Sequence, residues 1–454
     1  MNKHLIDKYN IPAPRYTSYP TVPFWENERF SAHQWKQSVA RSFRESNPQE
    51  GISLYIHLPF CESLCTFCGC NKRITKNHQV ERPYLETVLK EWQMYKDLFD
   101  TPPRIKEMHL GGGSPTFFSA QNLGWLIEGI LADTELDDTP LFSFEGNPNN
   151  TTKEHLQVLY NLGFRRVSYG IQDYDLNVQK AIRRIQPYEQ VQLTHEQSKA
   201  VGYTSINHDL VYGLPLQTLE SVLDTIRKTE ALAPDRIAFY SYAHVPWVKG
   251  SGQRGYSETD LPKSAAKRQL YEEGRQLLES GGYREIGLDH FSLSNDDLYQ
   301  ALEEKRLHRN FMGYTSSKTQ LMIGLGVSSI SDSWYAFAQN VKKVEEYQHL
   351  VNSGELPVFR GHHLNTEDLI IRQHILNLMC QLETSWTNEE AKLGGFDGLM
   401  PHLEEFEKDG LISVSNEGIK IKAEGRPFIR NICMAFDARL WRNKPETRIF
   451  SMAI

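Results

Sequence analysis

Four of the six cysteines fall within ten residues, in the segment CESLCTFCGC. Cys61, Cys65 and Cys68 have the spacing C-x3-C-x2-C, and Cys70 follows after one glycine. Three closely spaced thiolates directly after a strand-like run suit three irons of a [4Fe–4S] cubane, which leaves the fourth iron open for catalysis. The spacing predicts that Cys61, Cys65 and Cys68 hold such a cluster. Cys70 is predicted to be a non-ligand, because only one residue separates it from Cys68.

Two other interpretations of the cysteine cluster remain open on the residues alone. A zinc site normally uses two C-x2-C pairs separated by a longer loop, and here there is no second pair and no histidine inside the loop. Unligated thiols are the third possibility.

Cys380 and Cys433 lie alone in the apolar segments ILNLMCQL and RNICMAF and are expected to be buried structural thiols. Because a disulfide framework spreads its cysteines along a short secreted chain, the clustering indicates a reducing, cytoplasmic compartment.

Strand-like runs alternate with helix-like segments before residue 245. The runs cover residues 52–60, 105–113, 141–148, 165–172, 205–213 and 236–244. Segments between them, such as 83–99 and 152–164, carry apolar residues at three- and four-residue spacing, which is typical of amphipathic helices. This alternation predicts βαβ units with a parallel sheet, and six units favour a partial, open (β/α)6 barrel over a closed eightfold one. Polar and glycine residues follow each run, at the carboxyl end, where such folds place their chemistry.

Three segments are expected along the chain. Residues 1–50 form an N-terminal arm, residues 51–335 the barrel with an extension, and residues 336–454 a mostly helical C-terminal domain. In the last segment, helical patterns precede the strand pair LISVSN and GIKIKAEG, as in a winged helix. It lacks a basic recognition face, so a packing or lid role is predicted.

Composition excludes several classes of protein. The 454 residues carry a net charge of −7 without a basic block, which argues against a nucleic-acid partner. No apolar run approaches the ~18 residues of a membrane-spanning helix. The opening MNKHLIDKYN has no apolar stretch of the secretory kind, so no signal peptide is expected.

The cysteine spacing, with an aromatic residue before the last cysteine, resembles the radical S-adenosylmethionine (SAM) signature. Further segments narrow the resemblance to the family of oxygen-independent coproporphyrinogen III oxidases, over nearly the whole chain. They are PRYTSYPT (14–21), GGGSPT (111–116), GIQDY (170–174), HDLVYGLP (208–215), SYAHVP (241–246), GLDHF (287–291), HRNFMGYT (308–315) and RNICMAFD (430–437). The resemblance implies that SAM chelates the open iron and is cleaved by one electron to a 5′-deoxyadenosyl radical.

The resemblance also implies two bound SAM molecules. It assigns to the first Tyr55, Gly112, Gly113, Ser114, Glu145, Ala243 and Ile330, and to the second Phe67, Gln172, Arg184 and Asp209. The family often has threonine where Ser114 stands, and the hydroxyl is kept. On the residues alone, the glycines could form a plain strand-to-helix turn, Tyr55 could pack in the core, and Arg184 could be an exposed helix charge.

By the same resemblance, the reaction is the oxidative decarboxylation of two propionate side chains of coproporphyrinogen III, giving protoporphyrinogen IX in anaerobic haem biosynthesis. The substrate carries four carboxylates, so cationic and phenolic donors are expected near the cluster. Candidates are Arg15, Tyr16, Tyr19, His308 and Arg309, although a surface arginine is most often only solvated. An electron donor and an acceptor are required, and the chain is expected to be a monomer.

Two rival functions are open. The first is a haem-binding chaperone of the same superfamily, which keeps the cysteine motif without the decarboxylase activity. By resemblance, those proteins lack the PRYTSYPT arm and have phenylalanine where Cys70 stands, so both features favour the enzyme. The second rival is a zinc-stabilised structural protein, which an iron-free, colourless preparation would support.

Overall fold

The computed structural model describes residues 3–246, 252–253, 255–447 and 449–453. The chain separates into two compact units. The barrel unit comprises Ala32–Tyr299 and Thr319–Phe359. The terminal unit comprises Met1–Ser31, Gln300–Lys318 and Arg360–Ile454, so it brings together both ends of the chain.

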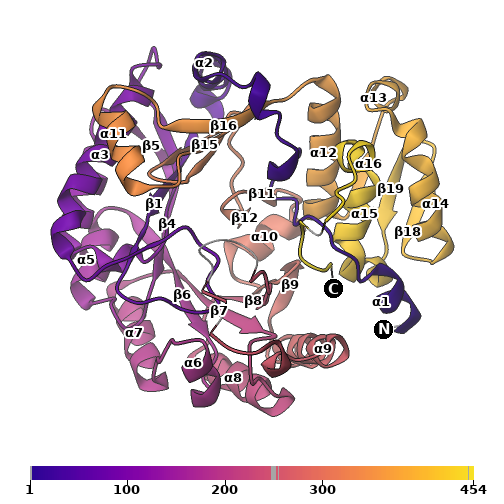
Figure 1. The fold of residues 1–454 in the computed structure, drawn as a ribbon, viewed down its shortest axis with the longest axis horizontal. Helices are drawn as coiled ribbons and strands as arrows, with labels where there is room; N and C mark the ends of the chain where they lie inside the picture. The colour runs from indigo at the N-terminus through magenta and orange to yellow at the C-terminus, as the bar shows by residue number, and fades with distance from the viewer. Residues whose placement is uncertain (1–2, 247–251, 254, 448, 454) are drawn as a thin grey trace. The chain divides into compact units, whose positions relative to one another are not determined.

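A twelve-stranded sheet runs through the barrel unit (Figure 1), in the order β16-β15-β14-β13-β1-β4-β5-β6-β7-β8-β10-β9. Its centre is six consecutive parallel strands, which correspond to the six predicted runs. They are β1 (Ile52–Leu58), β4 (Arg104–Gly112), β5 (Glu135–Gly146), β6 (Phe164–Gln172), β7 (Ser205–Tyr212) and β8 (Arg236–Ser241). The predicted α/β fold with an open parallel barrel is confirmed, since the outermost described strands do not pair with each other.

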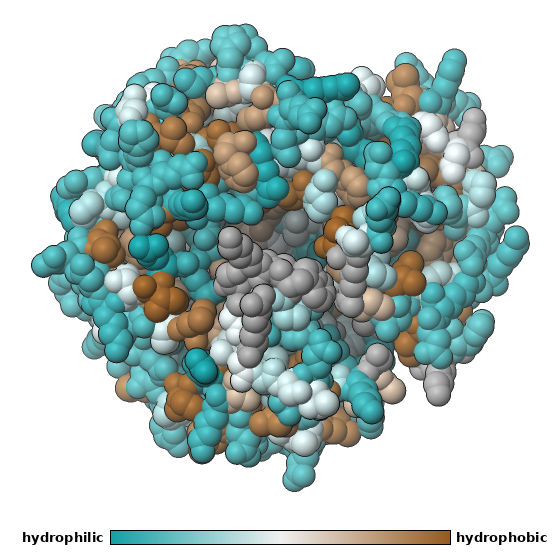
Figure 2. All heavy atoms as spheres, viewed as in Figure 1, coloured by the Kyte–Doolittle hydropathy of each residue, from teal (hydrophilic) through white to brown (hydrophobic). Residues whose placement is uncertain are grey.

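Helices connect the parallel strands and cover the outside of the sheet (Figure 1). They are α3 (Glu81–Lys96), α4 (Ala120–Leu131), α5 (Lys153–Asn161), α6 (Leu176–Ala181), α7 (Tyr188–Val201), α8 (Leu219–Leu232) and α9 (Ser264–Ser280). Capping boxes at Thr152 and Thr218 start α5 and α8. Over α5 and α7, Figure 2 shows mostly hydrophilic side chains, as expected for the solvent side of amphipathic helices.

The sequence pattern suggested that the strands end near residue 335, but the sheet continues beyond it. β13 (Leu321–Leu325) pairs in parallel with β1, and β14 (Ile330–Asp332) and β15 (Ala336–Asn340) continue the sheet antiparallel. All five residues of β15 are buried, so AFAQN lacks the alternation that marks a half-exposed strand. β16 (Val358–His363), β9 (Arg284–Gly287) and β10 (His290–Ser292) complete the sheet, while α2 (Ala32–Glu50) and α11 (Val344–Asn352) also belong to this unit. The three-segment division of the chain stays a prediction.

The terminal unit is mostly helical, as predicted for the C-terminal region. Its helices are α1 (Lys3–Tyr9), α12 (Thr366–Gln381), α13 (Asn388–Leu393), α14 (Met400–Lys408), α15 (Ile429–Ala435) and α16 (Ala438–Arg442), and α10 (Asp297–Glu303) leads into it. The expected strand pair is present as β18 (Ile412–Ser415) and β19 (Gly418–Ile421), joined by β17 (Glu383–Ser385). A hairpin of β11 (His308–Asn310) and β12 (Gly313–Thr315) adds to the unit. No described helix combines the length and hydropathy needed to span a bilayer.

The first residues of the chain are built into the terminal unit. The Arg430 guanidinium donates to the carbonyls of Ala13 and Pro14, and the Tyr16 hydroxyl lies 3.0 Å from Asp437 Oδ2. Tyr16 and Tyr19 are only 2 % and 1 % exposed. The PRYTSYPT segment is non-helical, and its tyrosines form part of a core.

A buried carboxylate holds the turn that follows β13. Glu91 of α3 accepts hydrogen bonds from Gly326 N at 2.8 Å, Asn340 Nδ2 at 2.7 Å and Tyr347 Oη at 2.6 Å. The residue is fully buried, and burial outweighs these donors to raise the pKa of Glu91 to about 7. The network therefore ties α3 to the β13 turn, β15 and α11.

Replacing Glu91 with glutamine should destabilise the protein most at acidic pH. The hydroxyl oxygen of protonated Glu91 can still accept a hydrogen bond, whereas the glutamine NH2 group only donates, so one buried donor loses its partner, at a cost of about 1–3 kcal/mol. Because the folded pKa lies above the ordinary 4.5, the Glu91 contribution is full below pH 4.5 and is lost as pH rises through about 7. Urea unfolding at pH 5 and pH 8 measures this. Equal differences between wild type and E91Q at both pH values would contradict the assignment, and Tyr347→Phe, which removes one donor, serves as the control.

Candidate functional site

Polar side chains line one face of the parallel strands near their carboxyl ends. The register places Tyr55 beside His109 and His109 beside Ser143. Further along, Ser168 pairs with Glu145 on one side and with Asn207 on the other. The predicted SAM residues on strands, Tyr55, Gly112, Glu145, Gln172 and Asp209, all belong to this edge of the barrel unit. The structure thus brings together residues that are over 150 positions apart in the sequence.

The cysteine loop leaves this edge after β1 and is anchored at both flanks. Cys61, in β2 (Phe60–Cys61), pairs with Ile74 in β3 (Arg73–Ile74), and Thr75 N donates to Cys61 O at 2.9 Å. On the other flank, Thr66 donates through its backbone to Ile182 O at 2.9 Å and through its hydroxyl to Ala181 O at 3.0 Å. These bonds fix the segment that carries the three thiols.

The thiols influence one another electrostatically. Burial, with the nearby Cys68 and Cys65, raises the pKa of Cys61 to about 12. A hydrogen bond from Cys70, opposed by burial, lowers the pKa of Cys68 to about 6. Among the described residues, no His, Cys, Asp or Glu group converges on a point where a single metal ion could be held. A cubane does not need such convergence, because each thiolate binds a different iron.

Two cations flank the thiols. The Lys72 ammonium donates to Cys68 O at 3.2 Å and to Cys70 O at 3.3 Å. The Arg184 guanidinium lies 3.9 Å from Cys65 Sγ. Both cations act to lower the pKa of Cys68, so they favour thiolate at this site.

The glycine segment after β4 allows close approach to the backbone. Gly112 has φ +116°, and a Cβ there would come within 2.8 Å of the His57 ring. A Cβ at Gly113 would lie 2.6 Å from the Pro59 carbonyl. The next side chain, Ser114, has a buried hydroxyl oxygen with no hydrogen-bond partner in the described part of the chain. A polar ligand could use this hydroxyl.

The surroundings of Glu145 stabilise its ionised form. Its Oε1 lies 3.4 Å from His109 Nε2, and its Oε2 accepts from Gly112 N at 3.2 Å. Burial acts to raise the pKa of Glu145, but His109 and the Gly112 amide hold it below its ordinary value. The His109 ring is fixed in turn by Ser143 Oγ, 2.8 Å from Nδ1.

His57 links the cysteine loop to Tyr55. Its Nε2 lies 2.9 Å from Asn71 O, which can only accept, so Nε2 carries the proton. Burial lowers the pKa of His57, so the ring is neutral and the bare Nδ1 accepts from the Tyr55 hydroxyl at 3.1 Å. His57 therefore orients Tyr55, and it fixes the residue that directly follows Cys70.

Among the carboxylates of the site, Asp209 has the pKa that is shifted most from its ordinary value. Asn207 Nδ2 donates to Asp209 Oδ1 at 2.7 Å and to Ser168 Oγ at 2.8 Å, while Ser168 Oγ donates to Oδ2 at 3.1 Å. Burial and the nearby Glu145 charge raise the pKa of Asp209 to about 7. A cation bound between the two carboxylates would relieve this penalty.

Arg184 and Gln172 lie together beside the cysteine loop. The Arg184 Nη2 donates to Gly170 O at 2.7 Å, while its buried Nε has no hydrogen-bond partner among the described residues. A Cβ at Gly170 would meet both side chains, at 2.6 Å from Gln172 Nε2 and 3.1 Å from Arg184 Nη2. The glycine thus leaves room for two polar groups suited to a carboxylate or a ribose.

Three remaining SAM predictions also lie in the barrel unit. Phe67 packs against a buried cluster that includes Val178 and Tyr242. Gln253 donates to both Phe67 O, at 3.0 Å, and Ala243 O, at 3.1 Å. Ile330 is the first residue of β14, and a Cβ on Gly324 of β13 would lie 2.5 Å from its carbonyl oxygen. The contacts of Phe67, Ala243 and Ile330 with SAM stay predictions.

The five predicted substrate residues all belong to the terminal unit. Arg309 is 4 % exposed and lies over the Tyr314 ring, with Nε and Nη1 buried and without hydrogen-bond partners in the described chain. Its Nη2 donates to Arg15 O at 3.4 Å. Burial, with the charges of Arg372 and Lys318, lowers the pKa of His308 to about 3. Tyr16 and Tyr19 are core residues of this unit.

The donor set fits the cofactors that the sequence implies. Three thiols on one anchored loop can hold a cluster, and the glycine segment, Ser114 and Glu145 offer an acceptor, a hydroxyl and backbone groups to a charged amino acid. The buried Arg184 Nε is a second donor without a partner within the described residues. These unpartnered groups are the structural observation that favours a bound polar ligand.

Several supporting side chains were not predicted from the sequence. They are His57, Lys72, His109, Ser168 and Asn207. His57 and Asn207 stand two residues from Tyr55 and Asp209, on the same strand face. That period of two could have identified these two residues. No comparable signal marks Lys72, because its contacts are to backbone carbonyls.

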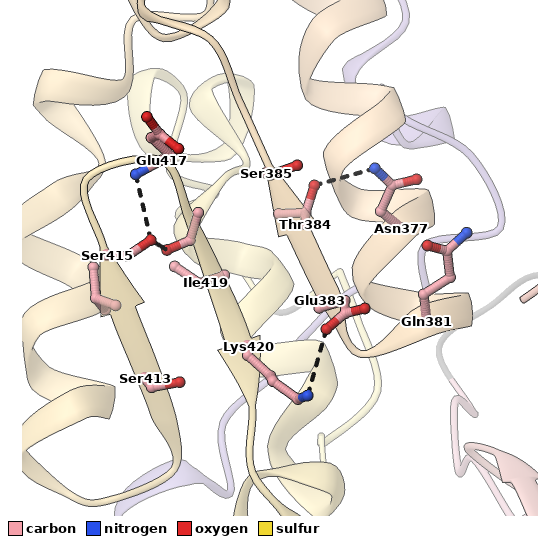
Figure 3. Close-up of a pocket in the computed structure, with 12 residues that line it drawn as sticks. Asn377, Gln381, Glu383, Thr384, Ser385, Ser413, Ser415, Glu417, Ile419 and Lys420 are labelled. Carbon is pink, nitrogen blue, oxygen red and sulfur yellow. Dashed lines mark hydrogen bonds and ion pairs between the residues drawn. The ribbon is translucent and has the colours of Figure 1, made fainter.

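A hollow lies in the terminal unit (Figure 3), and none of the predicted site residues lines it. It has a volume of about 570 Å³ and lies over β17, β18 and β19. Its walls are polar, with an ion pair of 3.6 Å between Lys420 and Glu383 and a hydrogen bond of 3.1 Å between Asn377 and Thr384. None of the residues that line it is a cysteine or a histidine.

Comparisons with known proteins show which family the chain is similar to. Residues 55–229 match the Radical SAM superfamily. Oxygen-independent coproporphyrinogen III oxidase of Helicobacter pylori strain J99 is 40 % identical over 440 residues, covering 95 % of both chains. The protein of that name from Escherichia coli K12 is 36 % identical and covers 99 % of this chain and 98 % of its own. A solved structure of coproporphyrinogen III oxidase (HemN) from Escherichia coli, a radical SAM enzyme, matches with a TM-score of 0.89 at 34 % identity, over 96 % of this chain and 98 % of that one.

Proposed function

Since the chain belongs to the family of oxygen-independent coproporphyrinogen III oxidases, we propose that it decarboxylates coproporphyrinogen III oxidatively to protoporphyrinogen IX in anaerobic haem biosynthesis. It is an oxidoreductase of the radical SAM superfamily, with a [4Fe–4S] cluster and SAM as cofactors. The observation that carries the proposal is the strand-end site with three thiols on one loop, in a chain that matches a solved family member over nearly its full length.

Cys61, Cys65 and Cys68 would hold the cluster, and Gly112, Gly113 and the Ser114 hydroxyl would bind the methionyl part of SAM. When bound, the cluster and SAM would supply a 5′-deoxyadenosyl radical that abstracts a β-hydrogen from each of the two propionates to be decarboxylated. The protein's share is positioning. Glu145, anionic beside His109, would bind the SAM ammonium, and the neutral His57 would keep the Tyr55 hydroxyl in place.

A second SAM molecule would bind at Phe67, Gln172, Arg184 and Asp209. The unpartnered Arg184 Nε and the raised pKa of Asp209 support this proposal, because both indicate a polar or cationic ligand. Ala243 and Ile330 would line the first SAM. The substrate propionates would be bound by Arg15, Tyr16, Tyr19, His308 and Arg309, of which Arg309 offers two buried donors without partners among the described residues.

The protein would act as a cytoplasmic monomer with a separate electron donor and electron acceptor. The decisive experiment is anaerobic turnover of the reconstituted protein with SAM and coproporphyrinogen III. The expected product has lost two carboxyl groups as CO2, by mass, and 5′-deoxyadenosine accumulates with it. A preparation that instead retains haem and leaves coproporphyrinogen unchanged would favour a haem-binding chaperone.

Replacing Lys72 with methionine should lower the midpoint potential of the cluster. The Lys72 ammonium donates hydrogen bonds to the carbonyls of Cys68 and Cys70. A positive charge at this position stabilises the reduced cluster, because that state is more negative. A charge at this range in a partly hydrated site gives a shift on the order of 50 mV. Electron paramagnetic resonance (EPR) at controlled potentials measures it.

The matched controls are Lys72→Arg, which keeps the charge, and Lys76→Met, which removes an exposed charge from the same segment. Both should stay near the wild-type potential. An unchanged midpoint in K72M would show that Lys72 only fixes the loop.

A further inference from the structure

The outside of the cysteine loop forms a surface that the proposed catalytic residues do not use. Three large apolar side chains are exposed there: Leu64 by 37 %, Ile74 by 40 % and Ile185 by 49 %. Three exposed cations, Lys76, Lys180 and Arg183, lie on the same segments. We call these six residues the cluster-loop surface. Exposed apolar side chains next to charges of one sign are typical of sites that bind another protein.

Contacts with the thiol loop connect the two flanks of this surface. On one flank Ile74 pairs with Cys61, and Lys76 follows two residues later. On the other flank Thr66 bonds to Ala181 and Ile182, between Lys180 and Arg183. Each flank therefore lies one or two residues from a segment that directly touches the loop.

The surface carries an excess of positive charge. Within the described part of the chain, Lys76, Lys180 and Arg183 form no ion pair. Two of the neighbouring acidic groups are already engaged: Glu62 lies 3.4 Å from His78 Nε2, and Glu345 lies 3.0 Å from Arg73. An approaching acidic protein would therefore meet unneutralised cations around exposed apolar side chains.

We propose that the cluster-loop surface docks an acidic protein that carries one electron and passes it to the cluster on Cys61, Cys65 and Cys68. The proposal rests on the proposed function, which requires an electron at that cluster. In the transfer the carrier is oxidised by one electron and the cluster is reduced by one, and no bond or proton is exchanged. The loop that ligates the iron is then also the contact, so the electron route is short. Small contacts of this kind are usual for transient redox complexes.

Charge argues for this occupant over two others. In a symmetric pair of copies, a surface of this kind would face itself and place its cations against one another, which is unfavourable. A nucleic acid would need a larger basic area than three cations on a chain of net charge −7. An acidic carrier meets both the cations and the apolar side chains.

Stopped-flow reduction of the reconstituted holoenzyme tests the proposal, with pre-reduced flavodoxin as the acidic carrier and dithionite as a small reductant. For wild type, the bimolecular rate with flavodoxin should fall steeply with ionic strength. The charge reversal K76E/K180E should lower that rate about tenfold at low salt. Its reduction by dithionite should stay within about twofold of wild type, because the cluster itself is unchanged. The neutral variant K76Q/K180Q, with a smaller loss expected, keeps the test valid if the reversal folds poorly.

The matched control is R44E/R227E, which reverses two exposed cations that lie on helices leading toward the amino ends of strands. A wild-type flavodoxin rate in K76E/K180E would overturn the proposal, and so would an equal loss in R44E/R227E. A concentration-dependent dimer of wild type that Ile185→Ser dissociates would assign the surface to a second copy instead. Cluster reduction is read by absorbance without any porphyrin, so failure of the proposed decarboxylation with dithionite would leave this test standing.

Discussion

Replacing Cys61, Cys65 or Cys68 with serine is expected to leave a folded protein that holds no [4Fe–4S] cluster after anaerobic reconstitution. The hydrogen bonds that anchor the loop come from Thr66, Thr75 and Lys72, and the cysteines contribute only backbone atoms to them. The substitution should therefore remove a ligand and keep the loop. Iron and sulfide analysis, visible absorbance and release of 5′-deoxyadenosine from SAM should all fall to background.

Cys70→Ser is the matched control for this prediction. Cys70 is the most exposed of the four loop cysteines, and its contact with Lys72 is through the backbone carbonyl. We expect this variant to retain most of its iron. Complete loss of the cluster in C70S would mean that Cys70 is a ligand and that the spacing argument is wrong.

The parallel sheet could be predicted because its signal is local. Each of the six strands is a short apolar run followed by polar and glycine residues, and each connecting helix repeats apolar residues at helical spacing. Strands β13, β14 and β15 were not predicted, because they are short and nearly all their residues are buried. Short apolar runs of this kind do not distinguish a strand from a buried helical turn.

The site could be predicted only as far as motifs extend. The spacing of the cysteines and the glycine segment pointed to the carboxyl ends of the parallel strands, where the structure brings polar side chains together. The roles of Asn207 and Ser168 depend on register between strands, which the sequence does not state. The same applies to the pKa of Asp209, since burial and the Glu145 charge come from other strands.

The N-terminal arm illustrates a limit of motif reasoning. PRYTSYPT is aromatic and contains two prolines, which favours an extended segment that needs a surface to lie on. The structure shows that residues around it are core elements of the terminal unit, with Arg430 bonded to Ala13 and Pro14 and Lys8 paired with Asp409 at 2.6 Å. Deleting residues 1–25 would therefore unfold part of that unit and could not test substrate binding. A side-chain variant such as Arg309→Lys is the better probe of the proposed propionate contacts.

The proposed second SAM site leads to a prediction about protons as well as activity. Asp209 has a pKa of about 7, so near neutral pH it is partly protonated in the free protein. A positively charged ligand beside it stabilises the ionised form and lowers this pKa. SAM binding should then release about half a proton at pH 7 and almost none above pH 8.5, where Asp209 is already ionised.

Isothermal titration of SAM in two buffers of different ionisation enthalpy measures the proton release and the stoichiometry together. The wild-type protein should bind two SAM molecules, and Asp209→Ala should bind one, without proton release. The cluster should remain, and its EPR change on SAM addition should be largely present, because Asp209 is not placed at the first SAM. Decarboxylation should fall about 10- to 100-fold, as expected for the loss of one charge-assisted contact.

Glu145→Gln is the variant that separates the two sites. It removes the proposed partner of the first SAM ammonium, so the EPR change on SAM addition should weaken while one SAM still binds. Because the Glu145 charge contributes to the raised pKa of Asp209, proton release in E145Q should also shrink. Asp209→Asn keeps the shape of the side chain without its charge and should behave like Asp209→Ala. If D209A and D209N still bound two SAM molecules and decarboxylated at the wild-type rate, Asp209 would have no part in a second site, and its raised pKa would reflect only burial and the Glu145 charge.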